Sequence, residues 1–295
     1  MNKIFTTFRL ENSLKNILIF FPFLLSEKNF FSTTLIDLFL GFLVFTFVTS
    51  ICYATNDYTD KKKDKINKLK STKKILDKNK IVFLNIVLFG ALFLLYHYSN
   101  LFNFYLILYL LFFYSYNFFL KNLFLIDIFV LVLFYIIRLF YGSTILSLEI
   151  SYWFLIFFSS IFLILSISKR MIQISVNKLK TKSIIINYSY KDYHLLKSII
   201  FVSFLINISV FILYIYEIYN PGSFAYFSSE FTSYKYKIVT LVLFFVAYIS
   251  WFLRLIFLVI NEKISSDIYI FLLKDKFSYS FVVIPFIIIL LYNLY

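Results

Sequence analysis

The residues with the clearest chemical meaning form an acidic motif at positions 56–64, which reads NDYTDKKKD. Oxygen-bearing side chains of this motif share one face of an α-helix, within an arc of roughly 100°: Asn56, Asp57, Asp60 and Asp64. Such oxygens suit hard divalent cations, and Mg²⁺ usually binds through one or two carboxylates together with substrate phosphates. We therefore expect these four residues to bind Mg²⁺ and a diphosphate, with the three aspartates as catalytic residues.

A second interpretation places the motif in a solvated loop, where its acids only balance the ten lysines between positions 56 and 80. The spacing NDxxDxxxD and its place directly after an apolar segment favour the metal-binding interpretation. The formal net charge of +14 does not indicate a nucleic-acid-binding protein, because the cations lie in short loops without a recognisable binding module. Anionic lipid headgroups or a phosphorylated substrate are the expected partners.

The element that must position the motif is a membrane helix. Of the 295 residues, 61% are apolar and 15% are charged, whereas soluble domains average roughly 45 to 50% and about 25%. This composition excludes a water-soluble enzyme. The long, continuously apolar runs favour helices over the alternating strands of a barrel. We expect an all-α, polytopic membrane protein with about nine spans, at residues 15–25, 34–55, 80–97, 101–119, 122–143, 152–170, 198–219, 237–260 and 277–294.

The distribution of cations predicts the orientation of these spans. With the N-terminus inside, 24 of the 29 lysines and arginines fall on the cytoplasmic side or at its edge, as the positive-inside rule requires. The chain is then a single integral-membrane domain, residues 1–295, with cytoplasmic loops at 56–80 and 169–197. Arg138 and Arg254 lie within spans, and Arg138 is about 25 Å along a straight helix from Lys121, so we expect it to extend toward the far membrane face.

The acidic motif and the nine-span layout resemble the UbiA superfamily of intramembrane prenyltransferases. Most members carry a second aspartate-rich motif after the sixth span, but loop 169–197 contains only Asp192. In place of that motif the sixth span ends in Lys169 and Arg170, a pair suited to phosphate. With this cationic pair, the chain resembles the branch of the superfamily typified by decaprenyl-phosphate phosphoribosyltransferase.

Further positions match that branch over most of the chain. Residues 9–16, RLENSLKN, are similar to its RPxQWxKN segment and keep the lysine and asparagine, and Tyr53 precedes the acidic motif at the branch's spacing. Residues 116–121 and 152–154 also match, as do the single positions Tyr135, Arg138 and Gly142, and the stretch from Ser266 to Asp275 is a weaker match. The resemblance implies these substrate-binding residues: Lys15, Asn16, Tyr53, Asn56, Lys70, Lys73, Lys169, Arg170 and Arg254.

The implied reaction moves 5-phosphoribose from phosphoribosyl diphosphate to a polyprenyl phosphate and releases diphosphate, with Mg²⁺ as cofactor. The resemblance also implies a bacterial inner membrane, cytoplasmic active-site loops and a role in cell-envelope biosynthesis. One alternative is an ordinary UbiA-type prenyltransferase that moves a prenyl group from prenyl diphosphate to an aromatic or lipid acceptor. A more distant alternative is a transporter, although the chain lacks the paired Gly or Pro interruptions of broken helices. The pattern assigns no oligomeric state and no role to Gln173, Asp267 or Asp275.

Overall fold

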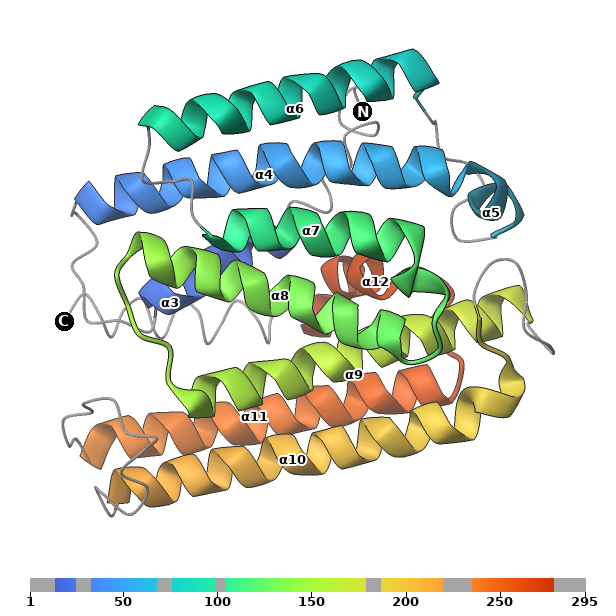
Figure 1. Ribbon diagram of the computed structural model, residues 1–295. Coiled ribbons are helices and arrows are strands. Elements are labelled where there is room, and N and C mark those ends of the chain that lie inside the picture. The colour runs from blue at the N-terminus through green and yellow to red at the C-terminus, as the bar shows by residue number, and fades with distance from the viewer. Residues whose placement is uncertain are drawn as a thin grey trace. The chain divides into compact units, whose positions relative to one another are not determined.

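The computed structural model describes residues 14–24, 33–67, 76–98, 104–178, 187–219 and 235–278 (Figure 1). These ranges contain helices and connecting turns but no strand, so the expected all-α fold is confirmed for them. The helices, labelled as in Figure 1 with 3₁₀ helices as η, are η1 (Leu14–Phe20), α3 (Phe21–Leu24), α4 (Thr33–Thr59), α5 (Lys61–Ile66), α6 (Lys78–Tyr98), α7 (Phe104–Phe118), η2 (Leu120–Asn122), α8 (Ile126–Ile145), α9 (Tyr152–Asn177), η3 (Tyr190–Asp192), α10 (Tyr193–Tyr219), α11 (Lys235–Ile260) and α12 (Ile268–Lys274).

Four helical segments within the described ranges are long and apolar enough to cross a membrane: Leu35–Thr59, Ile126–Ile145, Tyr152–Asn177 and Tyr190–Glu217. Two shorter apolar helices cover Phe104–Phe118 and Phe245–Ile260. These helices indicate a membrane protein, as the composition predicted. The count of about nine spans is not confirmed. Residues 15–24 form a 3₁₀ helix and a short α-helix, and most of the last predicted span lies outside the described residues.

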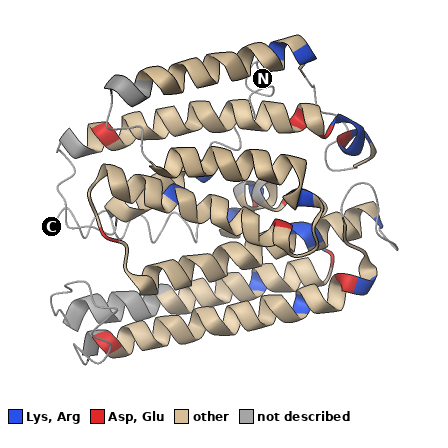
Figure 2. Cartoon of the chain, viewed as in Figure 1, with Lys and Arg blue, Asp and Glu red and all other residues tan. Residues whose placement is uncertain are grey.

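Charged residues concentrate near the ends of the long helices, whose middle parts are largely uncharged (Figure 2). Large apolar side chains are exposed along the same helices, for example Phe39 and Phe47 on α4 and Phe83 and Phe93 on α6. Extended exposed apolar surface is a liability in water but matches the hydrocarbon of a bilayer. The outward faces of α4 and α6 are therefore suited to lipid.

The chain divides into two compact units. Unit 1 comprises residues 1–150 and 184–187. In it, α4 contacts both α6 and α7, and α8 contacts η1, α3, α4 and α7 (Figure 1). Phe45 of α4 joins these helices, because its ring centroid lies 4.9 Å from those of both Tyr109 and Tyr141. Such tilted and edge-on ring pairs add to the burial of apolar surface.

Unit 2 comprises residues 151–183 and 188–295, and α9 contacts α10, α11 and α12. Helix α9 starts where the Ser151 hydroxyl accepts a hydrogen bond from the Phe154 amide at 3.3 Å, a typical N-cap. Along its length the buried Asn207 of α10 donates to the Ser160 hydroxyl of α9 at 2.8 Å. The rings of Phe211 and Phe245 stack at 3.8 Å between centroids and join α10 to α11.

Candidate functional site

The acidic motif lies where α4 ends and α5 begins. The Asp60 amide donates to the Asn56 carbonyl at 2.9 Å, and the Asp64 amide donates to the Asp60 carbonyl at 2.8 Å. These bonds keep helical spacing through the junction, so Asn56, Asp60 and Asp64 follow one another at intervals of one turn, with Asp57 next to Asn56. Asp57 is 6% exposed and Asp64 is 4% exposed, which is unusual for carboxylates.

Asp60 forms an ion pair that the sequence analysis did not predict. Its Oδ1 lies 2.7 Å from the Nζ of Lys121 in η2, and both side chains are about seven-eighths buried. Beside this pair, the Nζ of Lys63 donates to the Asn122 Oδ1 at 2.9 Å. The short segment after α7 thus holds the acidic motif through two lysine contacts. The sequence offered one sign of this ion pair, because Lys121 is the single cation between two predicted spans.

The arrangement of the carboxylates in the acidic motif limits how a divalent cation could bind there. Within the described ranges, no three histidine, cysteine, aspartate or glutamate side chains lie together as a metal-binding group. The carboxylates of the motif therefore do not form a complete protein cage for a cation. The donor set still fits Mg²⁺, which commonly takes one or two carboxylates and fills its remaining positions with water and substrate phosphate.

Arg138 of α8 lies deep in unit 1 and is only 1% exposed, so the expectation that it extends toward the membrane face is wrong. Its Nε donates to the Asn16 Oδ1 at 2.9 Å, and its Nη2 lies 3.4 Å from the Tyr53 hydroxyl and 3.3 Å from the Tyr109 hydroxyl. Its Nη1 donates to the carbonyl of Phe134. Hydrogen bonds inside the unit therefore replace those that water at the membrane surface would make with the guanidinium group.

Two predicted substrate-binding residues, Asn16 and Tyr53, thus meet through Arg138. Asn16 is fully buried, and its Nδ2 donates to the hydroxyls of Thr46 and Thr49 of α4 at 3.1 and 2.9 Å. The Nζ of Lys15 lies 6.0 Å from the centroid of the Tyr53 ring. The structure therefore brings together the predicted residues of η1 and the start of the acidic face of α4.

A polar triad also holds the end of α4. The Asn85 Nδ2 of α6 donates to the Thr55 hydroxyl at 3.1 Å, and the Tyr114 hydroxyl of α7 donates to the Asn85 Oδ1 at 2.9 Å. Thr55 directly precedes the acidic motif. Side-chain hydrogen bonds between apolar helices fix their rotation and register, because few other polar groups are available there.

The predicted phosphate-binding pair of unit 2 lies on α9. Arg170 is 6% exposed, and its Nη1 donates to the Oε1 of Gln173 at 2.7 Å. Gln173, to which the sequence pattern assigned no role, acts as a neutral acceptor for the arginine. Lys169 is half-buried on the same helix. Both cations therefore lie in the last third of α9.

Arg254 of α11 is engaged by a carboxylate. Its two terminal nitrogens contact Asp275 at 2.6 and 2.9 Å, and its guanidinium lies 4.8 Å from the centroid of the Phe277 ring. Asp275 also accepts from the amide and hydroxyl of Ser278. These hydrogen bonds, that of Arg254 first, hold the pKa of Asp275 well below its ordinary value. The predicted substrate-binding Arg254 is thus part of a bidentate ion pair.

The predicted substrate-binding residues Lys70 and Lys73 lie outside the described residues.

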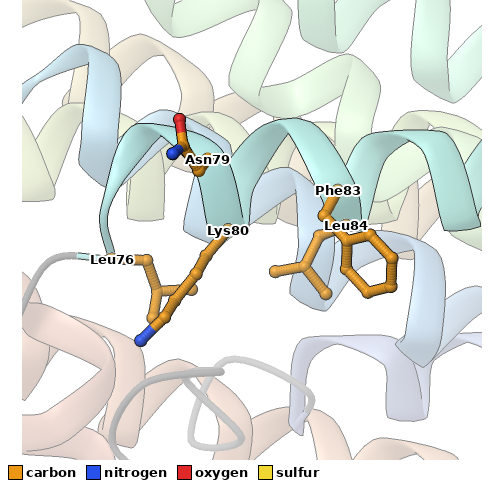
Figure 3. A pocket seen from close by; sticks show the side chains of 5 residues that line it. All are labelled: Leu76, Asn79, Lys80, Phe83 and Leu84. Atoms are coloured by element: carbon orange, nitrogen blue, oxygen red, sulfur yellow. The ribbon is translucent and has the colours of Figure 1, made fainter.

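Two surface pockets lie apart from the acidic motif. One on α6 has a volume of about 380 Å³ and is lined by Leu76, Asn79, Lys80, Phe83 and Leu84. Figure 3 shows Lys80 and Leu84 extending from the same side of α6, with Asn79 on the other side. The second, of about 490 Å³, is lined by four residues of unit 2: Ser175, Lys178, Tyr190 and Glu262. The acidic motif lines neither pocket.

No family model matches the chain, and no curated protein matches it.

Proposed function

We propose that this protein transfers 5-phosphoribose from phosphoribosyl diphosphate to a polyprenyl phosphate, with release of diphosphate. The observation that supports the proposal is the state of the acidic motif. At the end of a 27-residue apolar helix, two of its carboxylates are buried and the third is paired with Lys121. Burying carboxylates is costly, so two buried carboxylates close in sequence to an ion-paired one favour a role with a charged ligand.

The proposed transfer requires few catalytic groups. The attacking atom is a phosphate oxygen of the lipid, which is already anionic, so no strong general base is needed. Asn56, Asp57, Asp60 and Asp64 would hold Mg²⁺, which when bound neutralises charge on the departing diphosphate. Lys121, held at Asp60, would place a further positive charge near that group. Lys169 and Arg170 would bind a substrate phosphate, as the resemblance implies.

An ordinary prenyltransferase of the UbiA type is less well supported. Such an enzyme is expected to use acidic residues in the loop after the sixth span, where this chain has only Asp192. The Asp192 carboxylate accepts hydrogen bonds from the amide and the hydroxyl of Ser189, both at 2.9 Å, and completes a capping box for η3. The one acid of that loop therefore serves local structure.

We also propose the finer topology that the cation distribution predicts, with about nine spans, the N-terminus and the acidic motif in the cytoplasm, and a bacterial inner membrane as the location. The four long apolar helices support a membrane location. Attachment of a reporter enzyme to each loop would test the orientation. A cytoplasmic signal at the loop between Asn67 and Leu76, and its absence at the loop after Tyr219, are the expected results.

The test of the reaction uses detergent-purified protein, Mg²⁺, a polyprenyl phosphate and radiolabelled phosphoribosyl diphosphate. We expect a labelled lipid that disappears with chelator and with Asp60→Asn. Asp37→Asn is a matched control, because Asp37 is an exposed acid near the other end of the same helix. Absence of labelled lipid with the wild-type protein would refute the proposal. Turnover of prenyl diphosphate with an aromatic acceptor would instead support the prenyltransferase.

A further inference from the structure

Arg138 is a buried cation held by neutral groups. Within the part of the chain that the structure describes, its polar partners are the side-chain oxygens of Asn16, Tyr53 and Tyr109 and one backbone carbonyl. Aromatic rings surround it, with centroids 5.1 to 5.7 Å from the guanidinium carbon at Phe45, Tyr109 and Tyr135. Burial of a charge is costly unless hydrogen bonds and ring faces compensate for it. These partners must therefore keep their positions for Arg138 to remain buried.

The partners come from three other helices of unit 1. Asn16 belongs to η1, Tyr53 to α4 and Tyr109 to α7. Gly142 lies one turn beyond Arg138 on the same face of α8. A Cβ atom at Gly142 would be only 2.0 Å from the backbone oxygen of Ile19, so the absence of a side chain lets η1 contact α8 backbone to backbone. Arg138 and Gly142 together hold η1 against α8.

The position of η1 determines where Lys15 lies. Lys15 directly precedes the fully buried Asn16, and its ammonium lies 6.0 Å from the centroid of the Tyr53 ring. Tyr53 in turn precedes Asp57 by one helical turn. Asn16 also binds Thr46 and Thr49, so loss of its hydrogen bond to Arg138 would loosen Lys15 beside Tyr53 without detaching η1.

We infer that Arg138 is a positioning residue, which holds Asn16 and Tyr53 and thereby keeps Lys15 beside Tyr53, one helical turn before Asp57. The placement of Lys15 follows from the contacts in unit 1. Its consequence for substrate binding rests on the proposed function, in which Lys15 contacts a phosphate of the substrate. In that case loss of Arg138 weakens binding of phosphoribosyl diphosphate without removing any group that touches it.

The first experiment does not depend on enzyme activity. Cys52 is the chain's single cysteine and is buried, so Cys52→Ser gives a background for a cysteine probe at Lys15. We expect Arg138→Met to accelerate maleimide labelling of Lys15→Cys by about tenfold or more, the effect of losing one hydrogen bond from a charged group. Tyr109→Phe is the matched control, because it removes another hydrogen bond of Arg138 but lies on α7. It should leave the rate within about twofold.

Arg138→Lys provides a second variant in case Arg138→Met does not fold. Lysine keeps the charge but cannot reproduce the planar fork that reaches Asn16 and Tyr53 together. Faster labelling than in the Cys52→Ser, Lys15→Cys parent supports the inference. An unchanged labelling rate in a variant that elutes as a single folded species, with wild-type helix content, overturns it.

The second experiment measures the kinetics of phosphoribosyl transfer. Arg138→Lys should raise the KM for phosphoribosyl diphosphate by about tenfold and change kcat much less, because the lost group acts on binding through Lys15. In a Lys15→Ala background the same substitution should have little further effect, since both changes remove one interaction. Full additivity would contradict the inference. If the wild-type protein shows no transfer, the proposed function fails, whereas the labelling experiment still decides the role of Arg138.

Discussion

The Nζ of Lys121 lies 2.7 Å from the Oδ1 of Asp60, across 61 residues of chain. This ion pair joins the segment after α7 to the acidic motif, and both side chains are largely buried. Its strength depends on both partners, because the desolvation of each charge is compensated mainly by the other.

Removal of the lysine should therefore cost more than removal of both charges. We expect Lys121→Gln to lower the free energy of unfolding by about 1–3 kcal/mol, since it leaves the Asp60 carboxylate without its cation. The double variant Asp60→Asn, Lys121→Gln should recover most of that loss. Thermal unfolding of the wild type, the two single variants and the double variant in one detergent measures the coupling between the two residues. Additive losses would show that the ion pair does not contribute to stability.

Gly142 should not tolerate a side chain. A Cβ there would meet the backbone of Ile19 at 2.0 Å, so we expect Gly142→Ala to destabilise unit 1 by about 1–3 kcal/mol, as overpacking does. Gly90→Ala is the control, because Gly90 lies inside α6 and, among the described residues outside its own helix backbone, no atom lies within 4 Å of an added Cβ. That substitution should stabilise the helix by about 0.5–1 kcal/mol. Opposite shifts of the melting temperature are the expected result, and equal shifts would contradict the close approach.

The ion pair of Arg254 and Asp275 should make the free energy of unfolding depend on pH. The pKa of Asp275 is lower in the folded protein than in the unfolded chain, where it is about 4, so the pair stabilises the fold fully above that value. As the pH falls below about 4 the unfolded chain gains a proton first, and this contribution is progressively lost. The difference in unfolding free energy between wild type and Asp275→Asn should be equal at pH 7 and 5 and smaller at pH 3.

The control for this prediction is the partner residue. In an Arg254→Gln background the pH dependence of the Asp275→Asn effect should shrink, because the main cause of the lowered pKa is gone. A difference that grows toward pH 3 would have the wrong sign and would exclude the ion pair as its source.

Lys178 ends α9 in a left-handed conformation, with φ 53° and ψ 48°, at a position where glycine is favoured. The chain has only four glycines, and a lysine here carries the cost of a Cβ in that conformation. We expect Lys178→Gly to raise the free energy of unfolding by about 0.5–1 kcal/mol, after the entropy of the more flexible unfolded chain is subtracted.

Lys178→Ala removes the same charged side chain but keeps the Cβ, so it should leave stability nearly unchanged. Denaturant unfolding of both variants in the same detergent separates the two effects. A gain in Lys178→Ala equal to that in Lys178→Gly would assign the effect to the lysine charge instead of the backbone.

Local properties of this protein were accessible from its sequence. The apolar runs predicted helices and a membrane location, and both follow from side-chain composition along a single segment. The spacing of Asn56, Asp57, Asp60 and Asp64 predicted one face at a helix end, because the helical repeat is the same in every fold. The resemblance also singled out Asn16 and Tyr53, which the structure joins through Arg138.

Pairings between helices were decided only by the tertiary structure. The length of α8 alone placed Arg138 far from the cytoplasmic face and suggested solvent at the opposite membrane surface. The structure buries it against residues from η1, α4 and α7. The pairs of Asp60 with Lys121 and of Arg254 with Asp275 likewise depend on the rotation and register of neighbouring helices. Periodicity along one helix defines its apolar face, but it does not specify which polar group of another helix will lie opposite a given residue.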